Sequence, residues 1–224
     1  MLKALAASNK EIILLMPTLP SPTSKKIITD FISKYPNIRP VVYDTISSDA
    51  ALNSFEKYYG KRALADYDFS KAKTIVSIDA DFLGDWQGGG YEAGYAVSRI
   101  PNQNHGKAEM SQHFQFESNM SLTGANADYR IPCTPADQKN ILAYIHDRLI
   151  GNITGQLSEN LKSNADKAIA ALKKSGSKGV LVSGIEDEIA QAIVLAINSH
   201  LDSEVFIPES PKLTRQGNTK EVID

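Results

Sequence analysis

The stretch TIVSIDAD, residues 74–81, decides the fold class. All but one of its first five residues are β-branched, which is typical of a short strand buried on both faces, and Asp79 stands where this strand is expected to end. Such strands belong to mainly parallel sheets, in which helices form the crossover connections. The stretch therefore predicts a central strand of an α/β sheet with carboxylates at its carboxyl end.

The same alternation of short apolar runs and amphipathic segments continues on both sides of this strand. We expect strands at residues 11–16, 40–43, 74–78, 110–116, 179–183 and 204–207, and helices at residues 23–35, 48–59, 135–150, 157–174 and 187–200. The strand at 110–116 alternates polar and apolar residues and is expected to be less buried than the others. The predicted fold class is α/β, with a doubly wound, mainly parallel sheet of about six strands in a single domain over residues 1–224.

Residues 84–109 interrupt this pattern, because four glycines surround the single tryptophan, Trp86. We expect an irregular loop excursion or a short broken helix over the sheet edge. A lone exposed tryptophan among glycines is a plausible docking anchor, so Trp86 is a candidate contact to a partner.

Charge and cysteine usage exclude several classes of function. Lys and Arg number 24 and Asp and Glu number 26, a net charge of −2, so no basic surface is expected and nucleic acid is excluded as a partner. Cys133 is the single cysteine and cannot form an internal disulfide, an iron–sulfur site or a zinc ribbon. The four histidines lack the paired spacing of a metal site. We therefore assign no metal ligand and no catalytic residue.

The chain also lacks membrane signals. It contains no run of 18 apolar residues, and residues 1–10 lack the basic-then-apolar pattern of a signal peptide. We expect a soluble polypeptide without direct membrane insertion. The polar stretch at 218–224 resembles the first turns of a helix, so the chain is expected to be a fragment of a longer subunit.

The loops after the predicted strands carry mostly negative charge. Asp79, Asp81 and Asp85 follow the third strand, Glu117 follows the fourth, and residues 186–188 follow the fifth. Ligands of α/β sheets bind at these carboxyl ends. A pyrophosphate about 4 Å from Asp79 would meet a like charge, costing about 4 kcal/mol at an effective dielectric constant near 20. Ordinary cofactor binding is therefore disfavoured there unless a metal intervenes.

Three of these loops admit alternative interpretations. Ser21 and Thr23, ahead of the first helix, either hold an anion or simply cap the helix. Asp79 and Asp81 either cap the following turn or bind Mg²⁺ in a phosphohydrolase that resembles the haloacid dehalogenase group. The polar loop at 117–128 either docks a partner or satisfies its own backbone.

Three segments together resemble the molybdopterin oxidoreductase superfamily. They are LPSPTSKKIITDF (19–31), YYGKRALADYDFSKAKTIVSIDADFLGDW (58–86) and MSQHFQFESNMSLTGANADYRIPCTP (110–135), with a weaker likeness at LTRQGN (213–218). The resemblance is closest to the molybdopterin-like domain of the large iron–sulfur subunit of alternative complex III, a bacterial quinol:electron acceptor oxidoreductase. It implies a formate dehydrogenase/DMSO reductase-like domain.

The resemblance also implies where a cofactor would lie. Members of the superfamily hold molybdenum with two molybdopterin guanine dinucleotides, and their strand-end Gly-x-Asn aligns with residues 79–81, where a carboxylate replaces the glycine. A second nucleotide-contacting loop aligns with residues 117–119, and the turn after it aligns with residues 129–132. The positions of this vestigial cofactor-binding site are Ser21, Thr23, Asp79, Asp81, Glu117 and Asn119. The replaced glycine predicts that the molybdopterin guanine dinucleotide has been lost and that this fragment holds no cofactor.

The predicted function is thus a non-catalytic scaffold domain in a respiratory complex, where it supports electron transfer by iron–sulfur clusters elsewhere in the polypeptide. The partners that the resemblance implies are a ferredoxin-like iron–sulfur domain, a multihaem cytochrome c and a quinol-binding membrane subunit. It also implies a periplasm-facing location, peripheral to the inner membrane. The alternative functions are a domain that still binds molybdopterin guanine dinucleotide as part of a redox enzyme, and the Mg²⁺-dependent phosphohydrolase using Asp79 and Asp81.

Overall fold

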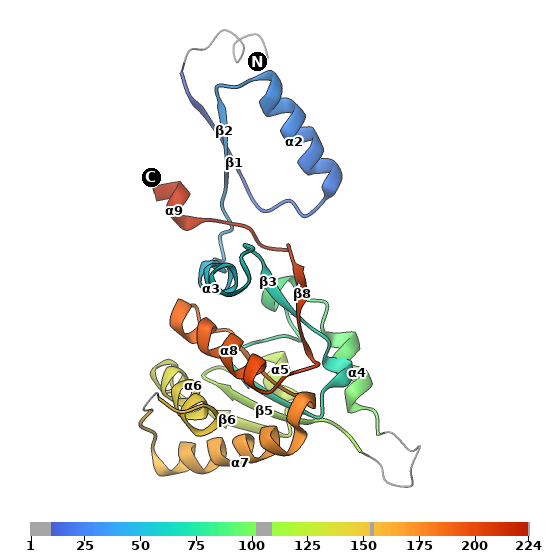
Figure 1. Ribbon diagram of the computed structural model, residues 1–224, viewed down its shortest axis with the longest axis vertical. Coiled ribbons are helices and arrows are strands. Elements are labelled where there is room, and N and C mark those ends of the chain that lie inside the picture. The colour runs from blue at the N-terminus through green and yellow to red at the C-terminus, as the bar shows by residue number, and fades with distance from the viewer. Residues whose placement is uncertain (1–9, 102–108, 153–154, 224) are drawn as a thin grey trace.

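The computed structural model describes residues 10–101, 109–152 and 155–223, and its centre is a four-stranded parallel sheet (Figure 1). The strand order is β6-β5-β4-β7, with β4 at Thr74–Ile78, β5 at Gln112–Glu117, β6 at Tyr129–Pro132 and β7 at Gly179–Ser183. Every residue of β4 and β7 is buried. The α/β class, the mainly parallel sheet and the two buried strands β4 and β7 are confirmed.

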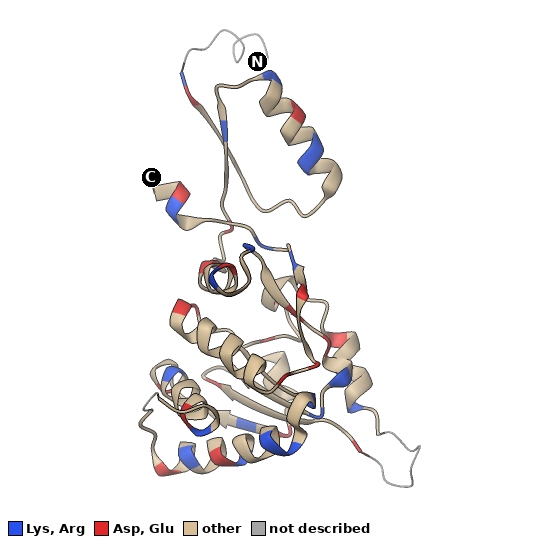
Figure 2. Ribbon diagram, viewed as in Figure 1, with Lys and Arg blue, Asp and Glu red and all other residues tan. Residues whose placement is uncertain are grey.

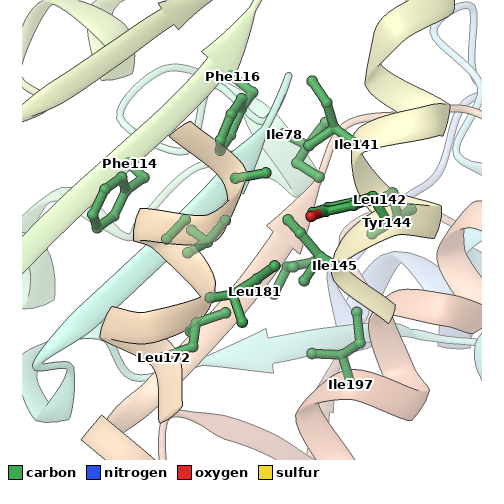
Figure 3. Packing of buried hydrophobic residues seen from close by; sticks show 14 of the residues in the cluster. Ile78, Phe114, Phe116, Ile141, Leu142, Tyr144, Ile145, Leu172, Leu181 and Ile197 are labelled. Atoms are coloured by element: carbon green, nitrogen blue, oxygen red, sulfur yellow. The ribbon is translucent and has the colours of Figure 1, made fainter. Parts of the chain in front are cut away.

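One face of this sheet is covered by α6 (Pro135–Leu149), α7 (Glu159–Ser175) and α8 (Glu188–His200). Figure 3 shows the close packing on this face, where strand residues meet Ile141 and Ile145 of α6 and Leu172 of α7. The predicted inward residues of α7 are all buried: Leu161, Ala165, Ala168, Ile169 and Leu172. On its outer side α7 carries charges of both signs (Figure 2).

The other face is covered by a largely aromatic cluster that includes Phe69, Phe82 and Tyr95. It lies beneath α3 (Asp49–Tyr59), α4 (Glu92–Arg99) and the short helices η1 (Phe69–Lys71) and η2 (Trp86–Gly88). The remaining short helices are α5 (Leu122–Ala125), η3 (Gly176–Lys178) and α9 (Thr219–Ile223).

Local sequence signals set the ends of the main helices. Thr134 and Asp137 exchange hydrogen bonds in a capping box, with Pro135 in the first turn of α6. The Asp187 carboxylate accepts hydrogen bonds from two backbone N–H groups at the start of α8. Gly60 ends α3 with a φ of +70°, a conformation that favours glycine.

The expected single sheet of about six strands is wrong, because the strands form three sheets. β1 (Ile12–Met16) and β2 (Ile38–Val42) form a separate parallel pair beside α2 (Pro22–Lys34), away from the central sheet (Figure 1). β8 (Phe206–Lys212) pairs antiparallel with β3 (Leu64–Tyr67), a strand that the sequence pattern did not indicate. β1 is not a buried strand, since Ile13 and Leu15 are 54% and 58% exposed.

One other expectation needs correction. β5 is buried rather than half-exposed, because its polar residues lie beneath the aromatic cluster and hydrogen-bond to one another. Of the two alternatives for the 84–109 excursion, the described part takes the helical one: it contains η2 and α4, with Tyr91 and Tyr95 buried against the sheet. Residues 102–108 of this segment lie outside the described residues.

Trp86 is not freely exposed. Its ring is partly buried, with its centroid 5.7 Å from that of Tyr67 and 5.5 Å from that of Tyr91. Trp86 is therefore half-buried, and its role as a docking contact stays a prediction. Among the described residues, no helix is both long and apolar enough to cross a lipid bilayer.

Candidate functional site at the carboxyl edge of the parallel sheet

Asp79 follows β4 directly and has a backbone φ of +57°. This is the left-handed region, which glycine adopts without cost and which aspartate tolerates better than most residues. Its side chain is exposed, although neighbouring protein atoms and the charge of Glu117 raise the pKa of its carboxyl above the ordinary value. The carboxyl end of the central strand therefore carries an acidic group that reaches solvent.

Asp81 binds a neighbouring loop of the protein itself. Its Oδ1 atom accepts hydrogen bonds from Thr123 N at 3.0 Å and Thr123 Oγ1 at 2.6 Å, and the same hydroxyl accepts from Leu83 N at 2.9 Å. Asp81 thus fixes the loop after β4 to helix α5. The Asp81 side chain bonds to a distant loop and not to the turn that directly follows it.

Glu117, at the end of β5, is 1% exposed, and both of its carboxylate oxygens accept hydrogen bonds. Arg130 Nε lies 2.5 Å from Oε1, and Ser121 Oγ and Gln115 Nε2 donate to Oε2 at 2.6 Å and 3.2 Å. A Cβ on Gly124 would overlap Glu117 Oε1, so α5 approaches this carboxylate as only glycine allows. The polar loop after β5 therefore satisfies itself around Glu117.

A buried polar row continues from Glu117 along the same face of β5. Gln115 lies 3.3 Å from His113 Nε2, and His113 Nδ1 lies 3.1 Å from the Tyr95 hydroxyl. Burial lowers the pKa of His113 to about 4, so its imidazole is neutral at pH 7. Sequence reasoning missed this row. The sequence pattern of this row is a polar residue at every second position of β5. The same pattern is expected for a face in solvent and for a buried network, so it does not distinguish the two.

A second ion pair, between Arg99 and Asp128, lies next to His113 at the other end of this row. Both Arg99 guanidinium nitrogens donate to Asp128, at 2.6 Å and 2.7 Å, and Asp128 also accepts from His113 N at 2.7 Å. Helix α4 is thereby tied to β5 and to the loop before β6. This arrangement is structural, because each of these groups is satisfied by the protein.

The strand order reverses between β4 and β7, and α/β ligands commonly bind at such a switch point. Here the two loops touch. Gly184 N donates to Ile78 O at 2.9 Å, and a Cβ on Gly184 would overlap the carbonyl oxygen of Asp79. The two loops pack backbone to backbone, and the Asp79 carboxylate stands beside them, so a dinucleotide pyrophosphate at this point would meet a like charge.

The structure brings four of the six predicted site residues to this edge: Asp79, Asp81, Glu117 and Asn119. Asn119 is exposed in the loop between β5 and α5. Ser21 and Thr23 are not part of it. Ser21 caps α2 through a 3.3 Å hydrogen bond from Ser24 N, and α2 lies beside β1 and β2 at the other end of the molecule (Figure 1).

Two kinds of chemistry lack the groups they need here. Among the described residues, no group of three His, Cys, Asp or Glu side chains is placed to hold a metal ion, so Asp79 and Asp81 have no third ligand partner. Cys133 lines an open cavity of about 400 Å³ beside Ser118 and Asp137. Burial and nearby carboxylates raise the pKa of its thiol to about 12, and a protonated thiol is a poor nucleophile.

Comparison with solved structures shows a likeness of fold. The chain is similar to a chain of the formyltransferase/hydrolase complex (FhcABCD) from Methylorubrum extorquens, solved with methylofuran, at 15% identity and a TM-score of 0.55. The likeness covers 89% of this chain and 52% of that chain, so this chain spans about half the length of the one it matches. No protein-family model and no curated protein matches the sequence.

Proposed function

We propose that this chain is a molybdopterin oxidoreductase-like scaffold domain of a respiratory quinol:electron acceptor oxidoreductase, and that it does not bind the cofactor. The finer fold assignment, a doubly wound domain of the formate dehydrogenase/DMSO reductase type, is part of this proposal. The observation that carries it is the Asp79 carboxylate at the switch point of the sheet, beside the close contact of Gly184 with the Asp79 backbone. An anionic nucleotide brought to this point would meet a like charge.

Electrostatics support the same conclusion. A pyrophosphate at the end of β4 would approach the Asp79 carboxylate, whose pKa is already raised by neighbouring protein atoms and by the charge of Glu117. Bringing a second anion to about 4 Å would cost about 4 kcal/mol at an effective dielectric constant near 20. Asp81 and Glu117 nearby are acidic as well. The guanidinium of Arg130 does not offset this repulsion, because it is already paired with Glu117.

The same residues have a role that suits a scaffold. Asp81, Glu117 and Asp128 each join a loop to another element of the sheet, so the acidic side chains stabilise the fold instead of meeting a substrate. The similar solved fold is part of a named multi-subunit complex, which supports a domain that works within an assembly. The partners we propose are a ferredoxin-like iron–sulfur domain, a multihaem cytochrome c and a quinol-binding membrane subunit on the periplasmic side.

The experiment is the molybdenum and guanine-nucleotide content of the full-length subunit purified from membranes. We expect no molybdenum and no guanine nucleotide in the subunit. We expect iron–sulfur clusters and c-type haem in the purified complex. One molybdenum and two guanine nucleotides per polypeptide would show a working molybdoenzyme and overturn the scaffold proposal. A preparation without c-type haem or iron–sulfur clusters would overturn the respiratory part.

A phosphatase assay tests the remaining alternative. If the chain hydrolyses a generic phosphate ester with Mg²⁺ and Asp79→Asn does not, the Asp79/Asp81 pair is catalytic and the scaffold proposal fails. We expect no Mg²⁺-dependent hydrolysis by either protein.

A further inference from the structure

A cavity of about 340 Å³ lies between α2 and the β1–β2 pair. It opens at the carboxyl ends of the two parallel strands, where Met16 and Val42 are the last residues. Ligands of α/β units bind at this end of parallel strands, and pockets for small molecules begin at about 300 Å³. Its lining is mainly apolar, with contributions from Met16, Pro17, Leu19, Ile28, Ile32, Pro40 and Val42.

The cavity exists because α2 does not close onto the sheet. No residue of α2 is buried, although Ile28 and Ile32 face the strands across the cavity. The cavity is open to solvent, so its apolar lining is in contact with water, and removing apolar surface from water is favourable. An apolar group inserted between α2 and the strands would therefore be favourable.

One end of the cavity is positively charged. Lys25 lines it one turn into α2, and among the described residues its ammonium has no hydrogen bond and no carboxylate partner. The next residue differs, since Lys26 pairs with Asp30 at 2.8 Å. The first turn of α2 has no acidic residue, so the helix dipole adds to the charge of Lys25.

The rim opposite Lys25 is held rigidly. Asp44 accepts hydrogen bonds from Thr18 Oγ1 at 2.6 Å and Gly217 N at 2.9 Å, and Gln216 N donates to Thr18 Oγ1 at 2.7 Å. These hydrogen bonds fix the loop after β1, the loop after β2 and the C-terminal segment to one another. Asp44 is thereby satisfied and does not pair with Lys25.

We propose that this cavity binds a small amphipathic carboxylate, with its anionic group at Lys25 and its apolar tail along Ile28 and Ile32. The charge of Lys25 favours an anion, and the mainly apolar lining favours an apolar tail. This site is separate from the carboxyl edge of the central sheet, and the proposal does not depend on the scaffold function.

The test is a titration of the 224-residue chain with octanoate, followed by NMR chemical shifts of backbone amides. We expect saturable shifts confined to α2, β1, β2 and residues 216–217. Lys25→Gln is expected to weaken octanoate binding about fivefold, the effect of one partly solvated ion pair. Ile28→Gln, at a partly exposed position, is expected to weaken it similarly through the tail.

Lys26→Gln is the matched control, because Lys26 is adjacent but paired on the outer face of the helix; it should leave the affinity unchanged. Octylammonium should bind at least about fivefold more weakly than octanoate, since its charge is repelled by Lys25. Absence of saturable shifts, equal binding of octylammonium, or equal losses in Lys25→Gln and Lys26→Gln would each overturn the proposal.

Discussion

Gly184 packs directly on the backbone of Asp79, with room for no side chain, because a Cβ at position 184 would overlap the Asp79 carbonyl oxygen. Two loops that follow neighbouring parallel strands are joined here at the point where the strand order reverses. This contact fixes the loop after β4 and the loop after β7 to each other.

Gly184→Ala should destabilise the fold by about 2–3 kcal/mol, since the added methyl group must displace backbone rather than a flexible side chain. Urea denaturation monitored by circular dichroism measures this. Gly60→Ala is the control: that position has open space but a φ of +70°, so it should lose only about 1 kcal/mol. Equal losses in the two variants would contradict the close approach at Gly184.

Asp79→Gly and Asp79→Ala should differ in stability because the backbone at this position has a φ of +57°. The alanine variant is expected to be about 1 kcal/mol less stable than the glycine variant, the cost of a Cβ in the left-handed region. Both variants lack the carboxylate, so the difference in their free energies of unfolding measures the cost of the left-handed backbone conformation alone. An alanine variant as stable as the glycine variant would exclude a left-handed conformation at residue 79.

Arg130→Met should destabilise the fold strongly, because it leaves the Glu117 carboxylate buried at 1% exposure without its cation. Loss of one partner of a buried pair costs about 3–5 kcal/mol. The double variant Arg130→Met with Glu117→Gln should recover part of this loss. Lys26→Met removes an exposed pair and should change stability by less than about 1 kcal/mol. If both single variants lose equally little, Glu117 is not buried as described.

Stability should fall as the pH is lowered from about 6.5 to 4 because of His113. Its pKa is about 4 in the folded protein and 6.5 in an unstructured peptide, so the unfolded chain binds the proton first. The two pKa values differ enough to remove roughly 3 kcal/mol across this range. His113→Leu should flatten the dependence of the urea midpoint on pH, whereas substitution of the exposed His200 should not. An unchanged slope in His113→Leu would refute a buried neutral imidazole.

The sequence by itself determined the elements whose signals are local. TIVSI and GVLVS are strands because consecutive β-branched and apolar residues suit burial on both faces, and Thr134 and Asp187 cap helices because their side chains reach the adjacent N–H groups. The positions of the carboxylates after β4 and β5 also followed from the sequence, since parallel strands end at one edge.

Only the tertiary structure decided how strands of distant segments pair and which polar residues are buried. β1 and β2 leave the central sheet, and β8 pairs with β3, because pairing depends on partners far along the chain rather than on period-two patterning. The alternation in β5 predicted a solvated face, yet α4 and the aromatic cluster cover it, so His113, Gln115 and Glu117 bond to one another. Likewise, no local pattern could place Gly184 on Asp79, since these residues are far apart in the sequence and meet only when β4 and β7 lie side by side.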